Sequence, residues 1–126
     1  MIAGADLAHV GPQFGDSYPL STTDLACVAV ADREMLAITC SGDADAFYQQ
    51  VMRDDDARRI CGLAPIYLLL ATLGSARGEL LRYARWADPA GHGSVTYAAV
   101  VFFADPEPVF APAGSGHRAP NPAPGA

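Results

Sequence analysis

The stretch Ala5-Asp6-Leu7-Ala8-His9-Val10-Gly11 lies near the start of a chain of 126 residues. It places a carboxylate and an imidazole three residues apart, directly after the apolar run Met1–Ala5, which we expect to be the end of a buried strand. The turn-forming pairs Gly11-Pro12 and Gly15-Asp16 then predict a loop over residues 6–18. Because ligands often bind in loops that follow strand ends in α/β proteins, Asp6 and His9 are the first candidate site residues.

Composition and charge narrow the class of protein. The chain is 51% hydrophobic and 17% charged, which is typical of a globular protein. Its net charge of -6 and the lack of an arginine stripe argue against nucleic-acid binding. All basic residues are Arg, which together with the many Ala, Gly, Pro and Asp residues suggests a GC-rich, bacterial genome. The three cysteines are irregularly spaced, and neither a secretory signal nor a membrane-spanning run is evident, so we expect a reduced, cytoplasmic protein without a membrane contact.

The apolar patterns predict an α/β protein. Helices are expected over 22–39, where Ser21 and Asp24 are capping candidates, over 43–53, and from Pro65 to a stop at Gly74. Strands are expected over 79–87 and 94–104 as an antiparallel pair, and the continuous apolar run 98–103 predicts that the second strand is buried on both faces. Residues 105–126 are rich in Pro, Gly and Ala and are predicted to be a disordered tail.

Two polar features are predicted to be structural. The run Asp54-Asp55-Asp56 resembles a metal site, but three consecutive side chains point in different directions. We therefore expect a solvated turn in which these carboxylates pair locally with Arg58 and Arg59. Cys27 and Cys40 lie on or just after the first helix, where we expect them to be small buried hydrophobic residues.

Cys61 is the third candidate site residue, because it directly precedes a predicted helix start that favours a thiolate. Imidazole and thiolate bind zinc, copper and ferrous iron well, and a nearby carboxylate can ligate the metal or orient the imidazole. Asp6, His9 and Cys61 are therefore a candidate metal site, although it needs further donors to be complete. His92, in a Gly-flanked turn, and His117, in the tail, are expected to be exposed.

Other chemistries are less well supported. Cys61 and His9 are also possible as a nucleophile and its base, with Asp6 as the only orienting residue. No G-x-S-x-G elbow supports a Ser/His/Asp hydrolase, and no glycine loop of the phosphate-binding type is present. The absence of a CxxC pair leaves a zinc ribbon or a thioredoxin-type site without support.

Four motifs follow one another along the chain: the stretch Ala5–Gly11, Ile60-Cys61-Gly62 with Pro65-Ile66, Leu81-Arg82-Tyr83-Ala84, and Ser94-Val95-Thr96-Tyr97-Ala98-Ala99. In this order and spacing they closely resemble the C-terminal half of the Memo family, whose prokaryotic members include the protein B component of the AmmeMemoRadiSam system. The resemblance covers about residues 1–103. It implies that residues 1–104 are the C-terminal portion of a three-layer α/β domain, similar to class III extradiol dioxygenases, with helices packed on a central sheet.

The resemblance also implies a site. His9 in Asp-x-x-His-x-Gly and Cys61 in Cys-Gly-x-x-Pro correspond to pocket residues of the family, and Asp6 is the carboxylate of the first motif. The family pocket binds a metal, with iron or copper as the candidates, and two His residues from the N-terminal half complete it. No segment of this sequence matches that half. We therefore expect a truncated product, a fragment or one half of a split protein, with an exposed sheet edge and apolar surface where the other half would pack.

Two functions follow from the resemblance. The first is part of a metal-dependent redox or dioxygenase-like pocket, which would be a non-haem oxidoreductase if active, although the absent half argues against activity of this chain alone. The second is a non-catalytic binding or adaptor module, as phosphotyrosine-peptide binding by animal members implies, or an inactive truncated fragment. The sequence shows no arginine cluster near His9 that would favour phosphate binding. The family name implies a radical-SAM partner, and a missing N-terminal half or a separate chain is the other expected partner.

Overall fold

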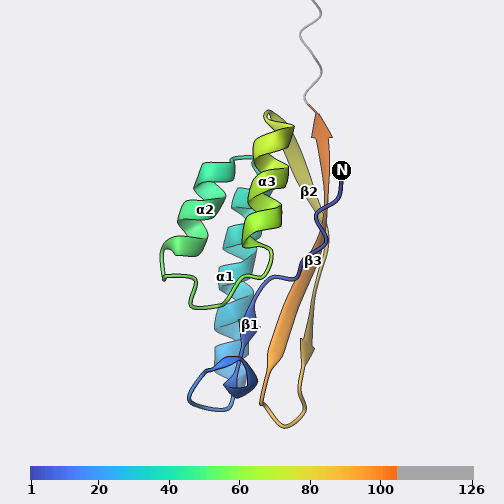
Figure 1. Cartoon of the computed structure of the whole chain (residues 1–126). Helices are drawn as coiled ribbons and strands as arrows, with labels where there is room; N and C mark the ends of the chain where they lie inside the picture. Colours follow the sequence, from blue (N-terminus) through green and yellow to red (C-terminus); the bar gives the residue numbers. More distant parts are fainter. Residues whose placement is uncertain (105–126) are drawn as a thin grey trace, which may run out of the picture.

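The computed structural model describes residues 1–104, so the predicted tail, including His117, lies outside the described residues. In chain order the elements are β1 (His9–Val10), the short 3-10 helix η1 (Pro12–Phe14), α1 (Thr22–Cys40), α2 (Ala44–Met52), α3 (Leu63–Leu73), β2 (Ala76–Ala87) and β3 (Ser94–Ala104). Figure 1 shows the three labelled helices gathered on one side of the long β2–β3 hairpin. The α/β class expected from the sequence is confirmed for this part of the chain.

Helix α1 begins and ends as its sequence predicts. The Ser21 hydroxyl accepts a hydrogen bond from the Asp24 N–H at 3.1 Å, and the Asp24 carboxylate accepts one from the Ser21 N–H at 2.7 Å. This reciprocal capping box satisfies N–H groups that have no partner within the helix. After the helix, Gly42 has a φ of 81°, and a Cβ there would lie 2.1 Å from the Ala76 carbonyl oxygen. Only glycine can therefore bring the end of α1 against the start of β2.

The two shorter helices also follow local signals. Asp43 caps α2 by accepting a hydrogen bond from the Ala46 N–H at 2.8 Å. Helix α3 carries Pro65 in its first turn and is followed by Gly74, whose φ is 63°. The sequence thus predicted all three helices, with boundaries within about two residues, as is usual for helix ends.

The sheet has the order β1-β3-β2 with antiparallel neighbours. The predicted pairing of the two long strands is confirmed, and a β-bulge between Leu80 and Arg82 shifts their register. β1 is only two residues long and pairs with the first residues of β3. Among the described residues, most of β3 therefore pairs with β2 alone.

The core lies between the helices and one face of this sheet. Its buried hydrophobic side chains come from every layer: Leu7, Ala8, Val10, Val28, Met35, Leu36, Phe47, Val51, Ile60 and Leu70. The prediction that β3 is buried on both faces is wrong, because Tyr97 is 44% and Phe103 57% exposed. The apolar run reflects one face that packs on helices and a second face that none of the described helices covers (Figure 1).

The predicted buried strand end at Met1–Ala5 is also wrong. No strand is formed before His9, and Ile2 is 94% exposed. The segment runs beside β3 without a ladder, since backbone bonding to β3 begins at Leu7. Among the described residues, no helix is both long enough and apolar enough to cross a membrane.

Candidate metal site

Two segments that carry the candidate ligands lie side by side. The Gly62 N–H donates to the Asp6 carbonyl at 2.8 Å, and the Cys61 N–H donates to the Leu7 carbonyl at 3.2 Å. On its other side, the Leu7 N–H donates to the Thr96 carbonyl of β3 at 2.8 Å. The stretch Ala5–Gly11 is therefore held between β3 and the segment before α3.

Gly62 makes this close approach possible. A Cβ at this position would lie 2.9 Å from the Asp6 carbonyl oxygen and 2.6 Å from the Ile66 side chain. Such contacts are shorter than real Cβ atoms make, so any larger residue would have to move one of the two segments. The glycine after Cys61 thus has a physical role in placing Cys61 beside Asp6.

The ring of His9 is oriented by the backbone. Its Nδ1 lies 3.1 Å from the Leu7 carbonyl oxygen, and because a carbonyl only accepts, Nδ1 carries the proton in this contact. Nε2 is then left with its lone pair, which is the tautomer that a metal-binding His requires. The His9 N–H donates to the Arg58 carbonyl at 2.7 Å, and Phe14 packs edge-on against the ring with centroids 5.1 Å apart.

The structure brings the predicted residues onto neighbouring backbone segments but does not gather their side chains. Asp6 and Cys61 are both exposed. Within residues 1–104, no group of three or more His, Cys, Asp or Glu side chains is placed to hold a metal. The donors have the right chemistry for iron or copper, but the described residues do not form a complete ligand set. No hydrogen bond joins Cys61 to His9 in this part of the chain, so the geometry adds nothing to the nucleophile–base alternative.

A buried ion pair beside the site has no counterpart in the sequence predictions. Arg58 forms a salt bridge with the fully buried Asp32 of α1, and the Tyr83 hydroxyl donates to the same carboxylate at 2.9 Å. Burial and the neighbouring Asp32 charge raise the pKa of the Tyr83 phenol. Because Asp32 lies 26 positions before Arg58, no local spacing could have indicated the pair.

A second ion pair fastens the loop after His9. The Arg59 guanidinium donates to Asp16 Oδ1 at 2.8 Å and to the His9 carbonyl at 3.3 Å. Asp16 Oδ2 also accepts from the Gly11 N–H at 2.6 Å. The Arg59 hydrogen bond, followed by the Gly11 N–H, holds the pKa of the Asp16 carboxyl below its usual value.

The ion pairs Arg58–Asp32 and Arg59–Asp16 differ from the pairing predicted from the sequence. Arg58 and Arg59 do not pair with the adjacent run Asp54–Asp56, because each reaches a carboxylate far away in the sequence. The turn itself is confirmed and carries positive φ angles at Asp55, Asp56 and Arg59. Arg58 and Arg59 lie next to the backbone of His9, but carboxylates bind both of their guanidinium groups.

Cys27, Cys40 and His92 lie in three different environments. Cys27 is exposed, so its predicted burial is wrong. Cys40 is half-buried, and burial raises the pKa of its thiol, which favours the unreactive form. His92 is exposed as predicted, and its Nδ1 lies 3.4 Å from Asp88 Oδ2 within the same turn.

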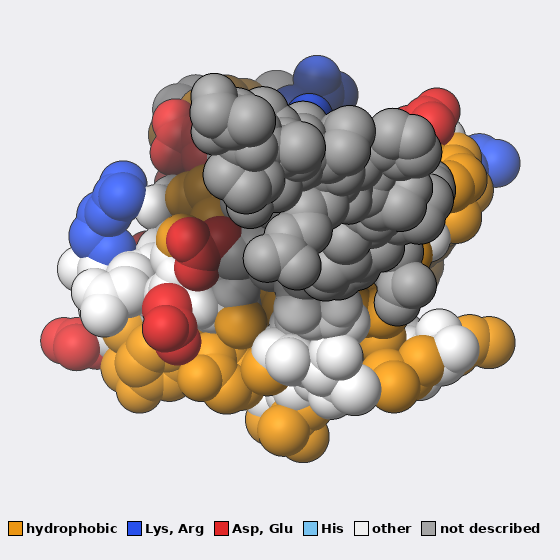
Figure 2. Space-filling view, turned by 90° about the horizontal axis from the view of Figure 1, so that it is seen from above, with side chains coloured by type: hydrophobic (Ala, Val, Ile, Leu, Met, Phe, Trp, Pro, Cys, Tyr) orange, Lys and Arg blue, Asp and Glu red, His pale blue; other side chains and the backbone are white. Residues whose placement is uncertain are grey.

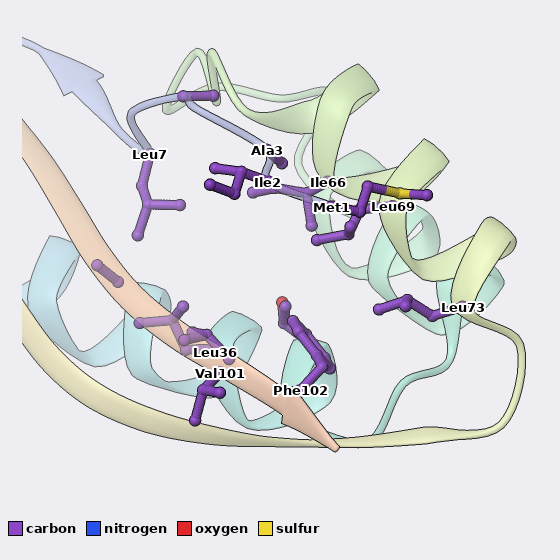
Figure 3. Close-up of a pocket in the computed structure, with 14 residues that line it drawn as sticks. Met1, Ile2, Ala3, Leu7, Leu36, Ile66, Leu69, Leu73, Val101 and Phe102 are labelled. Carbon is purple, nitrogen blue, oxygen red and sulfur yellow. The ribbon is translucent and has the colours of Figure 1, made fainter. Parts of the chain in front are cut away.

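An apolar cavity lies close to the candidate site but is separate from it. It has a volume of about 350 Å³ and opens between residues 1–5, α1, α3 and β3. Figure 3 shows Ile66, Leu69 and Leu73 of α3 along one side and Leu36 and Phe102 across from them. Asp6, His9 and Cys61 are not among its lining residues. The cavity therefore offers mainly apolar contact and contains none of the three predicted ligands.

The sequence model of the family described as Memo-like protein matches residues 1–101. The chain belongs to the Memo-like family. The match spans both segments of the candidate site, β1, β2 and most of β3 of this Memo-like chain. A comparison with curated proteins gives no match.

Proposed function

We propose that this Memo-like chain contributes Asp6, His9 and Cys61 to a pocket for an iron or copper ion, within a domain of dioxygenase-like architecture. The observation that carries the proposal is the backbone pairing of residues 6–7 with 61–62. It aligns the two motifs that hold these donors, although they are separated by more than fifty positions in the sequence.

The orientation of His9 supports the same proposal. Its Nδ1–H is held by the Leu7 carbonyl, so Nε2 is the ring nitrogen that would bind the metal. A cysteine thiolate together with an imidazole would make a softer donor set than two His and one carboxylate, which suits copper(I) as well as ferrous iron. Such a metal supplies redox chemistry when bound. This chain's residues would hold and orient the donors.

The proposed pocket needs donors from outside residues 1–104. The exposed positions of Asp6 and Cys61 leave their outward side open to another segment or a separate chain. We therefore propose that the pocket is shared, and that this chain alone binds the metal more weakly than a complete pocket would. Redox activity is assigned to the complete pocket and not to this chain by itself.

Metal titration tests the proposal directly. Purified full-length chain is equilibrated anaerobically with ferrous iron or with copper(I), and bound metal is measured by elemental analysis after dialysis. We expect His9→Ala and Cys61→Ala each to weaken binding by roughly tenfold or more, because each removes a direct ligand. The matched controls are His92→Ala and Cys27→Ala, which remove the same groups from exposed positions outside the two segments and should leave the affinity unchanged. Equal binding by wild type and both site variants would overturn the proposal.

A further inference from the structure

The loop that follows His9 is closed on itself by one carboxylate. Asp16 Oδ2 accepts a hydrogen bond from the Gly11 N–H at 2.6 Å, and the Asp16 N–H donates to the Gly11 carbonyl at 3.2 Å. We call residues 11–16 the Gly11–Asp16 loop, and it contains the short helix η1 (Pro12–Phe14). Two hydrogen bonds between its first and last residues therefore hold the loop in one shape.

The closed loop is also fixed to two other parts of the chain. The Gln13 N–H donates to the His92 carbonyl, in the turn between β2 and β3, at 2.9 Å. From the segment before α3, the Arg59 guanidinium donates to Asp16 Oδ1 at 2.8 Å. The loop lies at the lower end of the molecule in Figure 1, whereas Figure 2 shows the opposite end, where hydrophobic side chains form a broad part of the surface. Substitutions in the loop are therefore made far from that apolar surface.

The loop places an aromatic ring against the imidazole of His9. The ring centroids of Phe14 and His9 lie 5.1 Å apart, and the ring planes are perpendicular. This edge-to-face arrangement is one of the preferred geometries of aromatic pairs. The same imidazole is bound through Nδ1 to the Leu7 carbonyl at 3.1 Å. A hydrogen bond and an aromatic contact thus limit the rotation of the ring together.

The backbone of His9 is held by the cation that binds the loop. Arg59 Nη1 donates to the His9 carbonyl at 3.3 Å, while Nη2 binds Asp16. Because Arg59 lies two positions before Cys61, this guanidinium joins the two segments that carry the candidate ligands. Asp16 therefore acts on His9 indirectly, through Arg59 and through the shape of the loop.

We propose that Phe14 and Asp16 are positioning residues for His9. Together with Arg59, they hold the imidazole with Nδ1 toward the Leu7 carbonyl and leave Nε2 for a ligand. A ligand that is oriented beforehand loses less conformational freedom when it binds a metal. This consequence for binding rests on the proposed metal pocket, whereas the orientation of the ring is a property of the metal-free chain.

The tautomer of His9 in the metal-free full chain tests the orientation. Long-range proton–nitrogen NMR correlations distinguish a proton on Nδ1 from one on Nε2, at a pH where neutral imidazole predominates, and His9→Ala identifies the His9 signals. Wild type should show the Nδ1–H form. Phe14→Ala and Asp16→Ala should each give a mixture of both forms, because a ring that rotates more freely leaves the Leu7 carbonyl.

Matched variants separate positioning from a general loss of structure. Phe14→Tyr keeps an aromatic ring and should retain the wild-type tautomer. Tyr18→Ala removes an aromatic ring that is 80% exposed just after the loop, and Asp43→Ala removes a carboxylate that accepts a backbone N–H at the start of α2. Neither control should change the His9 signals. Circular dichroism of each variant checks that the fold is retained.

The metal titration described above measures the consequence for binding. Phe14→Ala and Asp16→Ala should each weaken the binding of ferrous iron or copper(I) by roughly tenfold, the lower end of the range for groups that orient a metal-binding His. Tyr18→Ala and Asp43→Ala should bind either metal as wild type does.

The two measurements distinguish failure of the positioning role from failure of the metal pocket. A wild-type tautomer in both Phe14→Ala and Asp16→Ala would overturn the positioning role. Unchanged metal affinity in variants whose tautomer has changed would do the same, as would equal effects of the controls Tyr18→Ala and Asp43→Ala. A wild type that binds neither metal would overturn the metal pocket alone, since the tautomer of His9 still decides whether the loop orients the ring.

Discussion

The segment from Arg58 to Gly62 contributes one residue to each of two groups of ionisable residues. One group is buried and the other is exposed. Asp32, Arg58 and Tyr83 are packed between α1 and the sheet, and the carboxylate of Asp32 is bonded by both partners. Asp6 and Cys61 lie at the surface, and among the described residues their side chains form no such network. The first group is a completed structural anchor, whereas the second is an incomplete set of donors. The anchor holds the Arg58 carbonyl that binds the His9 N–H, so the buried group supports the exposed one.

Breaking the anchor should have the largest effect. Asp32→Ala leaves the Arg58 guanidinium buried without a counter-charge and removes the acceptor of the Tyr83 hydroxyl. The free energy of unfolding, measured by urea denaturation, should fall by about 3–5 kcal/mol. Replacing both charges, as in Asp32→Leu with Arg58→Met, should recover a large part of this loss, because no unpaired charge remains.

Asp45→Ala is the matched control for the buried carboxylate. Asp45 also accepts a hydrogen bond from a tyrosine, Tyr67, at 3.2 Å, but this pair is exposed on α2 and α3. Water can replace the lost acceptor, so the cost should stay below about 1 kcal/mol. Equal losses for Asp32→Ala and Asp45→Ala would contradict the difference between the buried and exposed groups.

Gly62→Ala should lower the free energy of unfolding by an intermediate amount and should also weaken metal binding. The added Cβ collides with the Asp6 carbonyl and the Ile66 side chain, so the segment carrying Cys61 must move away from Asp6. We expect a loss of about 1–3 kcal/mol in the free energy of unfolding, together with weaker binding of added iron or copper. The control is Gly4→Ala, since a Cβ there meets nothing within 4 Å and should leave both measurements unchanged. Retention of full stability and metal affinity in Gly62→Ala would show that the close approach is not required.

The smallest effect is expected at Asp16, which pairs with Arg59 at the surface of the loop after His9. Its pKa is lower in the folded protein than in the unfolded chain, so the pair stabilises the fold fully above the unfolded value of about 3.8. This contribution is lost as the pH falls through the folded pKa. Asp16→Asn should therefore lower the free energy of unfolding at pH 7 by less than about 1 kcal/mol. The difference from wild type should vanish in strong acid, and a difference that grew on acidification would contradict the assignment.

Local sequence signals predicted the three helices and the hairpin well, but not β1, which lies inside the predicted loop 6–18. The capping residues Ser21 and Asp24, the stop at Gly74 and the apolar periodicity located the helices, because these signals act within a few positions of one another. The hairpin followed from two β-rich runs around a Gly-rich turn. Burial was predicted less well. The apolar run of β3 could not show that one of its faces lacks a helical layer, since burial depends on which elements pack there.

The sequence by itself determined the three helices, the hairpin, the membership of the Memo-like family and the choice of Asp6, His9 and Cys61 as candidate ligands. Tertiary structure alone decided that Asp6 lies beside Gly62, that His9 presents Nε2, and that Arg58 and Arg59 are held by Asp32 and Asp16. Helix caps and turns depend on neighbouring residues in the chain, so a few consecutive residues are enough to predict them. Pairing between distant segments depends on how the layers pack, which no short pattern of residues records.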